Sequence, residues 1–487
     1  MRQWVLIVLA ALGMTAISLE SPAQEVGALW TEKTPAWASA GVSPGSEAGQ
    51  WPPARLASFE NAYAGLDARL SALEAANSAN HAKAGWIDTS TEKFTVKVGG
   101  RIEADYVTFA HQDAASRAAF GDIPNYFEFR RLRLYASGKG YGVYDYKFQV
   151  DFEPEHSFTV RNADGTASTT IKSAGVAIRD IWIGIDEIPV LGYVRFGHYF
   201  EPFGLEQLTS PWHVSFLERS LPVVFARDRQ VGIEAHNHTA DESLMWSYGV
   251  FFPAIDPIAK EYVADSQGTD VAVRAVWTPW CVMEGRHLLH LGAGFVYNDD
   301  EDDSIRFFTR PETHESTIFV DTGDFAATAT QRVNAEAAWV RGPLSLQGEY
   351  FVVATDGIGA TPDMTFHGAY AYVSYFLTGE NRIYERTEGA FSGVVPNTNF
   401  WFVRTSSGCD LGWGAWEMLF RWSFVDLDDA ALTSPRRGQL HDTTLGLNWY
   451  WNPRTRYMLN WIHAFNDIAA AGRNDTDVIS MRLEIDF

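Results

Sequence analysis

The sequence has very little cysteine, few lysines and no long apolar run beyond its N-terminus. Its 487 residues include two cysteines, Cys281 and Cys409, too few for a disulfide scaffold or a cysteine metal site; they leave open one disulfide or two free thiols. No run of about 18 apolar residues follows the N-terminus, which excludes membrane-spanning helices. The formal charge is −23 without a dense basic cluster, which argues against nucleic acid as a partner. No lysine follows Lys260, so the positive charge beyond it is all arginine.

What the sequence has instead is a high aromatic content, 14%, and a strict alternation of apolar and polar residues. The alternation is clearest between residues 129 and 153, where Tyr144, Phe148 and Phe152 share one parity and charged or polar residues occupy the other. Successive side chains of a strand point to opposite faces, so this stretch has one apolar and one polar face. The segment from Gly138 to Gly142 has the composition of a turn, which predicts a hairpin.

The same alternation recurs sixteen times, an even number that favours an antiparallel barrel with both ends on one side. We therefore predict an all-β fold: a 16-stranded antiparallel transmembrane β-barrel at residues 93–487, preceded by a short helical segment. Short and long connections alternate, which is typical of outer-membrane barrels, but residues 378–413 are long on the short-turn side. The expected strands are the two halves of the hairpin at 129–153 and residues 94–107, 174–186, 191–198, 230–236, 245–252, 270–278, 288–297, 332–341, 344–353, 367–377, 414–425, 443–451, 457–463 and 477–487.

The apolar faces of these strands suit contact with lipid. Trp416, Phe420 and Trp422 alternate with polar residues in one strand, and aromatic residues near strand ends suit the two membrane interfaces. The chain ends on an alternating strand whose last residue is Phe487, which resembles the signal read by outer-membrane assembly machinery. We expect outer-membrane lipid and that machinery as partners, and the bacterial outer membrane as the location.

The N-terminal region is predicted to have three parts. Residues 1–23 read as a secretory signal peptide, with Arg2 before an apolar run and small residues at Ser21 and Ala23. Residues 24–52 read as a flexible linker. Residues 53–84 read as a periplasmic helix, either one amphipathic helix packed on the chain or a short coiled coil between subunits. The a/d stripe consists of Leu56, Phe59, Tyr63, Leu66, Leu70 and Leu73.

Five stretches carry a more specific pattern. They are FRRLRLYASGKGYGVYDYKFQVDF, IRDIWIGIDEIPVLGYVRFGHYFEPFGLEQLTS, FLERSLPVVFARDRQVGIEA, ENRIYERTEGAF and TLGLNWYWNPRTRYMLNWIHA. The most particular is GHYFEPFGLEQLTS at 197–210. With these residues the chain resembles the phosphate-selective porin O and P family of outer-membrane channels. The resemblance implies a homotrimer of sixteen-stranded barrels, each with a long third loop folded inward to narrow the pore.

Charged residues of the inferred lumen face are the candidate selectivity residues. In a wet barrel interior, Arg and Lys favour anions, whereas Asp and Glu favour cations. The alternative for each residue is a place in an interstrand ion-pair lattice. The third loop, 199–228, is the expected constriction and contributes Glu201, Glu206 and Glu218. The expected anion path comprises Arg131, Arg133, Arg195, Arg219, Arg227 and Arg229, and the expected lumen wall adds Lys97, Arg101, Lys147, Arg274 and Arg421.

These residues predict a porin for passive diffusion of small hydrophilic solutes, with anions such as phosphate or polyphosphate expected. The resemblance associates phosphate selectivity with lysines at the constriction, and the third loop has none, so a general or cation-preferring porin is the alternative. A barrel enzyme has little support, because no GxSxG stretch or convincing Ser/His pairing occurs. A tether built on residues 53–84 is the last alternative. We expect no cofactor or metal site, since the acidic run at 299–303 lacks the glycine and spacing of a calcium loop.

Overall fold

The computed structural model of the protein describes residues 94–152, 157–161, 168–172, 176–252, 268–299, 303–405 and 408–487. The expected signal peptide, linker and periplasmic helix lie outside these residues and remain predictions. Residues 300–302 of the acidic run also lie outside them. No helix in the described part of the chain is long and apolar enough to cross a membrane.

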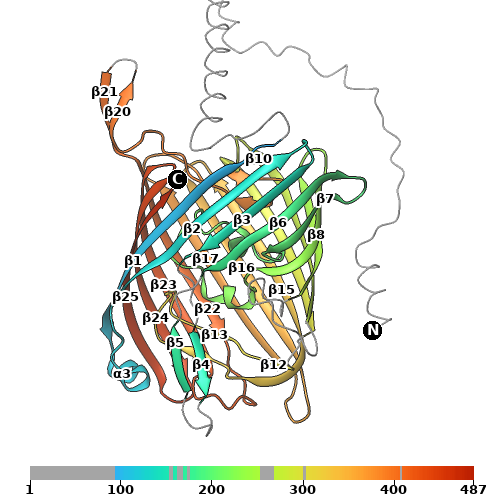
Figure 1. Cartoon of the computed structure of the whole chain (residues 1–487). Helices are drawn as coiled ribbons and strands as arrows, with labels where there is room; N and C mark the ends of the chain where they lie inside the picture. Colours follow the sequence, from blue (N-terminus) through green and yellow to red (C-terminus); the bar gives the residue numbers. More distant parts are fainter. Residues whose placement is uncertain are drawn as a thin grey trace, which may run out of the picture. The chain divides into compact units, whose positions relative to one another are not determined.

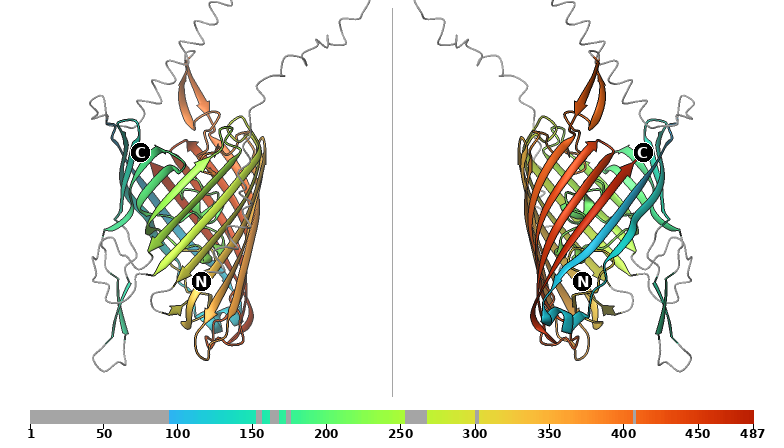
Figure 2. Two further views of the ribbon diagram at one scale, coloured as in Figure 1. Left: turned by 90° about the vertical axis from the view of Figure 1, so that its right-hand side faces the viewer. Right: turned by 90° about the vertical axis from the view of Figure 1, so that its left-hand side faces the viewer.

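Within the described residues, sixteen long strands form one closed antiparallel barrel, which confirms the predicted fold class. Each long strand pairs with the next one along the chain, and the first also pairs with the last, so the sheet closes on itself. Figures 1 and 2 show the strands winding obliquely around the lumen. The strands are β1 (Lys97–Gln112), β2 (Tyr126–Gly140), β3 (Tyr144–Asp151), β6 (Ala177–Ile188), β7 (Gly192–Tyr199), β8 (Gln230–His238), β9 (Leu244–Phe252), β10 (Thr269–Val282), β11 (His287–Asp299), β15 (Phe325–Arg341), β16 (Leu344–Gly357), β17 (Met364–Phe376), β22 (Ala415–Asp426), β23 (Gly438–Asn452), β24 (Thr455–Ile468) and β25 (Gly472–Asp486).

Short helices and hairpins lie between the long strands. In the described residues none of these helices exceeds the seven residues of α3, too few to be stable without packing against the barrel. They are α3 (Ala114–Phe120), α4 (Leu205–Leu208), the 3₁₀ helix η1 (Leu221–Phe225), β4 (Ser157–Arg161), β5 (Ser168–Lys172), β12 (Ser304–Ile305), β13 (Phe308–Thr309), β14 (Val320–Asp321), β18 (Tyr384–Glu385), β19 (Ala390–Phe391), β20 (Trp401–Thr405) and β21 (Gly408–Gly412).

On the outer surface, cross-strand neighbours build continuous apolar rows. Phe420 of β22 lies opposite Leu445 of β23, which lies opposite Trp461 of β24, and Ile479 of β25 extends the row. Residues of the other parity point into the lumen and are buried, as Arg421 is. A bilayer offers no water to the backbone, so a closed sheet with an apolar outer face is an arrangement that lipid permits.

The two ends of the barrel differ in their connections. At the turn end the strands are joined mainly by short turns, and this end also holds Phe487. At the opposite, loop end lie α3, β4, β5 and β12 (Figure 1). Phe487 and Gly100 of β1 exchange two backbone hydrogen bonds, of 2.8 and 2.9 Å, so the last residue of the chain closes the barrel seam.

The long connection at the turn end, residues 377–414, contains four short strands in its described residues and joins β17 to β22, which pair directly in the barrel, so the strand count made from the sequence is correct. Its first part, residues 377–396, is called the inner segment here; it contains β18 and β19 and contacts residues of the barrel interior. Its second part forms the β20–β21 hairpin, which projects from the barrel wall at the end that holds the C-terminus (Figure 2).

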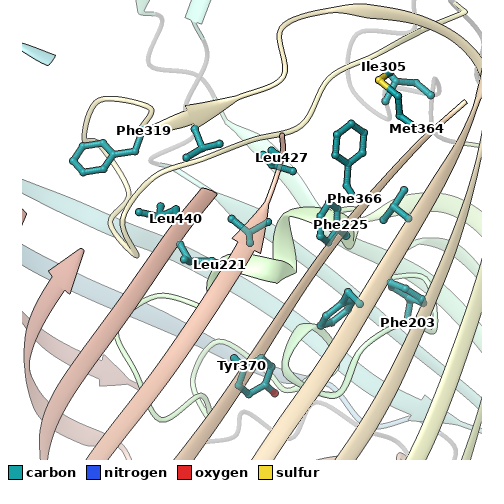
Figure 3. Packing of buried hydrophobic residues seen from close by; sticks show 14 of the residues in the cluster. Phe203, Leu221, Phe225, Ile305, Phe319, Met364, Phe366, Tyr370, Leu427 and Leu440 are labelled. Atoms are coloured by element: carbon teal, nitrogen blue, oxygen red, sulfur yellow. The ribbon is translucent and has the colours of Figure 1, made fainter. Parts of the chain in front are cut away.

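Two further segments turn inward and fill part of the lumen. Residues 200–229, between β7 and β8, are called loop 3, and residues 303–324, between β11 and β15, are called loop 5. Figure 3 shows Phe203 and Phe225 of loop 3 gathered with Phe319 of loop 5 and with Phe366 and Tyr370 of β17 in one buried cluster. Each buried phenylalanine contributes about 2 kcal/mol to this packing. Packed side chains therefore fill one part of the lumen, called the filled half here. The other part, called the open half, contains the cavities described below.

Candidate pore and its constriction

Loop 3 is fastened to the barrel wall by buried ion pairs. Glu201 lies 2.8 Å from Arg332 of β15, and Glu206 lies 3.2 Å from Arg421 of β22. The wall arginines are almost fully buried. Removing one partner of a buried pair typically costs about 3–5 kcal/mol, because the other charge is left buried and unpaired. These pairs therefore fix the position of the loop.

Glu218, the third acid of the loop, is held in the same way. Its carboxylate accepts two hydrogen bonds from Arg130 of β2, of 2.8 and 3.1 Å, and lies 2.7 Å from Arg482 of β25. Although burial opposes ionisation, the guanidinium groups of Arg130 and Arg482 hold the pKa of Glu218 well below its usual range. All three acids that the sequence placed at the constriction thus face the wall, and none of them lines the two cavities described below.

The short helix α4 in loop 3 begins at a carboxylate supplied by the wall. Glu349 of β16 accepts hydrogen bonds from the backbone N–H groups of Leu205 and Glu206, both at 2.8 Å. Gly204, the residue before the helix, has a φ of 81°, a left-handed conformation that suits glycine. Glycine at this position therefore lets the chain turn sharply enough to aim both N–H groups at the wall.

The open half of the lumen contains two neighbouring cavities. A cavity of about 340 Å³ lies between loop 3, the inner segment and the wall from β1 to β10, and one of about 520 Å³ is lined by β1, β2, β3 and β6. Together they are lined by eight basic residues and five acidic residues, an excess of three positive charges. The basic residues are Lys97, Arg101, Arg133, Lys139, Lys147, Arg195, Arg229 and Arg274, and the acidic residues are Asp145, Asp180, Glu234, Glu385 and Glu388.

The acids of the cavity wall are shared between several cations. Asp180 lies 2.5 Å from both Lys147 and Arg229, so one carboxylate serves two basic side chains. Asp151, beside the cavity, likewise lies 2.7 Å from Arg133 and 3.4 Å from Arg179. Asp228 also lies 3.1 Å from Arg179 and 3.2 Å from Arg229, so three carboxylates serve four basic side chains and leave a net positive charge. The lattice therefore keeps the cations in place without neutralising the lumen.

Two titratable groups of loop 3 have pKa values that make their charge constant near neutral pH. Burial, together with the charges of Arg101 and Arg456, lowers the pKa of His213 to about 3, so this cavity residue is neutral. Although burial raises it, Arg229 and Arg179 lower the pKa of Asp228 to about 2, so this carboxylate is charged. Neither group titrates between pH 5 and 8.

The inner segment narrows the pore from the turn end. Tyr384 and His290 of β11 share a hydrogen bond of 2.6 Å, and Arg274 of β10 donates to the carbonyl of Gly389 at 2.8 Å. Within the segment, the guanidinium of Arg382 lies 3.8 Å from the ring centre of Phe391. These contacts hold the segment in the lumen and expose two of its acids, Glu385 and Glu388, to the first cavity.

The structure brings seven of the eleven basic residues chosen from the sequence to the two cavities. The other four brace the structure instead: Arg131 pairs with Glu103, Arg219 donates to three carbonyls of loop 3, Arg227 binds Asp270 and Asn298, and Arg421 binds Glu206 and Glu312. The seven lining residues are Lys97, Arg101, Arg133, Lys147, Arg195, Arg229 and Arg274.

A β-bulge in β2 changes which residues face the lumen. The register of β1 against β2 shifts where Glu103 opposes Arg131 and Ala104 opposes Phe129, so Arg130 is the extra residue. Phe127 and Phe129 are exposed on the outer face, whereas Arg130 reaches Glu218 inside. Simple alternation assigns Arg130 to the lipid face, so the sequence analysis missed this residue; the pair of adjacent arginines in the strand was the available signal.

The inner-segment residues Glu385, Glu388 and Arg382 were also missed, although their stretch, ENRIYERTEGAF, stood out in the sequence.

Cys281 is a free thiol at the end of β10, partly buried at the turn end. The sequence left open one disulfide or two free thiols, and in the structure Cys281 is not part of a disulfide.

Comparisons with known proteins identify the family of the chain. A model of the family described as phosphate-selective porin O and P matches residues 96–487. Porin O of Pseudomonas aeruginosa is 26% identical over 426 residues, which cover 80% of this chain and 87% of that protein. An uncharacterized protein of Caulobacter vibrioides is 27% identical over 303 residues, 59% of this chain and 57% of its own length. Among solved structures, the outer membrane channel DcaP of Acinetobacter baumannii superposes with a TM-score of 0.48 at 10% identity, covering 83% of this chain and 100% of that chain.

Proposed function

Because the chain belongs to the phosphate-selective porin O and P family of the bacterial outer membrane, we propose that it is a passive diffusion pore that prefers small anions such as phosphate or polyphosphate. The observation that carries the proposal is a contrast of charge. The whole chain has a net charge of −23, yet the residues lining the two lumen cavities carry three more positive than negative charges. Positive rings in a wet barrel favour anions.

The basic residues form successive sites along the open half of the lumen. Lys97 and Lys139 line the second cavity, Arg101 and Lys147 line both cavities, and Arg229 lines the first. An anion moving along this wall meets one basic side chain after another, and several of these are already paired with a carboxylate of the wall, so the anion binds at each step but is not trapped. Conduction requires this combination of favourable entry and weak, multiple binding.

Phosphate suits this wall although loop 3 has no lysine. Arginine presents a planar fork of donors that matches a phosphate oxygen pair, and lysine acts as a point charge. Arg133 and Arg229 of the first cavity supply forks, and Lys147 lies 2.5 Å from the carboxylate that it shares with Arg229. The lysine is thus contributed by β3 rather than by loop 3.

A cation-preferring pore is the second candidate, and one observation favours it. Glu385 and Glu388 are exposed in the first cavity and would attract cations. The eight basic lining residues outnumber all five acids, so the anion preference is the stronger inference. Assembly into a homotrimer and recognition of the last strand by outer-membrane assembly machinery are parts of the same proposal, supported by the family and by the terminal Phe487.

Phosphate titration of single-channel conductance in KCl tests the proposal. If phosphate binds along the basic wall, millimolar phosphate lowers the chloride current saturably, and a Lys147→Gln variant needs more phosphate for the same block. A chloride current that phosphate leaves unchanged in both proteins would contradict the phosphate preference.

A further inference from the structure

Residues 312–315 of loop 5, called the strap here, cross the lumen at the loop end and contact the barrel wall at two places. Its Glu312 accepts hydrogen bonds of 2.6 Å from Ser423 of β22 and from Thr444 of β23, and it lies 2.5 Å from Arg421. Only two residues further on, His314 reaches Glu128 of β2. Around the barrel, β24, β25 and β1 lie between β23 and β2, so the strap spans this part of the lumen.

The second end of the strap is a group of three metal-ligating side chains. Glu128, His314 and Glu315 offer ligand atoms that all lie within 4.8 Å of one another, and all three residues are partly buried. The Nδ1 atom of His314 lies 2.7 Å from Oε2 of Glu128, and the other carboxylate oxygen, Oε1, is buried and accepts no hydrogen bond from the described residues. The backbone N–H of Glu315 donates to the hydroxyl of Tyr126 at 3.2 Å, which orders this residue next to β2.

We propose that Glu128, His314 and Glu315 bind a divalent transition-metal ion such as Zn²⁺, which ties loop 5 to β2 at the external mouth of the pore. One imidazole and two carboxylates are a ligand set that zinc accepts, and a water molecule completes the tetrahedron in sites with three protein ligands. The ion takes the place of the proton between Nδ1 of His314 and Oε2 of Glu128, and a carboxylate that binds the ion through both oxygens also gives the buried Oε1 atom a partner.

The neighbouring positive charge does not oppose the ion strongly. Arg130, two residues after Glu128, is engaged by both carboxylate oxygens of Glu218. The two glutamates of the site supply two negative charges for one divalent ion. The site is separate from the cavity wall, since none of its three residues lines either cavity, so the inference does not depend on which solute the pore passes.

The barrel contains a natural control. His463 of β24 and Asp477 of β25 form a pair with the same 2.7 Å separation, but no third ligand of the described residues joins them. A histidine–carboxylate pair alone is thus not the feature that defines the site. His463→Asn is the matched control for His314→Asn.

The test is calorimetric titration of the purified, detergent-solubilised protein with ZnCl₂ in buffer free of chelators. One Zn²⁺ per chain is expected to bind the natural protein and the His463→Asn variant, with at least tenfold weaker binding in Glu128→Gln and His314→Asn. In planar bilayers, Zn²⁺ added on the loop side should reduce current fluctuations in the natural protein but not in His314→Asn.

Two results would overturn the proposal: no saturable Zn²⁺ binding to the natural protein, or equal affinity in the natural protein and His314→Asn. Zinc-free conductance of each variant, compared with that of the natural protein, shows whether it has folded. If His314→Asn does not fold, Glu315→Gln replaces it in the same comparison.

Discussion

Glu206 and Arg421 lie 3.2 Å apart inside the barrel although 215 residues separate them in the chain. The pair joins the middle of loop 3 to the wall strand β22. Arg421 also donates to the carbonyl of Glu218 and pairs with Glu312, so one buried guanidinium holds both loop 3 and loop 5. The division of the lumen into a filled half and an open half depends on such contacts.

Removal of that guanidinium should release both loops. Arg421→Gln leaves the buried carboxylates of Glu206 and Glu312 without the cation that they share, and we expect the free energy of unfolding to fall by about 3–5 kcal/mol. The measurement is urea unfolding of the protein in lipid vesicles, with open-channel current noise as a second readout. Arg473→Gln, which removes an exposed pair with Asp467, is the control and should cost less than about 1 kcal/mol. Equal stability of the two variants would show that the buried pair does not fasten the loops.

Loss of one basic residue in the lumen should weaken anion selectivity. Lys147 lines both cavities, so Lys147→Gln removes a charge beside the path of the solute. One charge at roughly 6 Å in water favours an anion by about 0.7 kcal/mol and opposes a cation by about as much, so its loss lowers the anion-to-cation permeability ratio by up to about tenfold. The measurement is the reversal potential in a dilute KCl gradient. The exposed Arg473→Gln should leave the ratio unchanged, and a similar drop in both variants would mean that overall charge, not the lumen, sets the selectivity.

Neutralisation of the inner-segment acids should have the opposite effect. Glu388→Gln and Glu385→Gln each remove a negative charge from the first cavity, so the anion-to-cation permeability ratio should rise by up to about tenfold. Asp467→Asn, at an exposed position of the loop end, provides the matched control. An unchanged ratio in both inner-segment variants would show that this segment lies away from the conducting path.

The closed wall could be predicted from the sequence because the period of two is a local property of each strand. Phe420, Arg421 and Trp422 alternate in sequence as they do in space. The count of sixteen strands was correct although residues 377–414 form a long connection at the end where short turns were expected. The expected boundaries were mostly too short, as at 332–341 against the observed Phe325–Arg341, because the loop-end halves of strands carry fewer apolar residues. The position of loop 3 could not be predicted, since it depends on pairs between distant segments such as Glu206 and Arg421.

The roles of individual charged residues could not be predicted from the alternation of faces either. Parity assigns Arg274 and Arg421 to the lumen alike, yet the structure places the first beside a cavity and the second against loop 3. At the bulge, parity predicts the wrong face, because the inserted residue Arg130 reverses the faces of the residues that precede it in β2.

Acid should destabilise the fold through His213. Its pKa is about 3 in the folded protein and near 6.5 when unfolded, so between these values the unfolded chain binds more protons. Stability is therefore lost as the pH falls from about 6.5 towards 3. His213→Gln should lose less of its thermal stability than the natural protein between pH 7 and pH 4.5. Since His213 remains neutral from pH 8 to pH 5, the selectivity of both proteins should respond to pH in the same way over this range. A pH-dependent selectivity that His213→Gln abolishes would contradict this account.

The reversal potential of the purified natural protein in a planar bilayer under a KCl gradient tests the central claim most directly. The excess of basic residues along the cavities predicts a potential of the sign set by chloride, and a smaller potential in Lys147→Gln. A potential of the sign set by potassium would mean that Glu385, Glu388 and the other lumen acids dominate, and the proposed anion preference would be wrong.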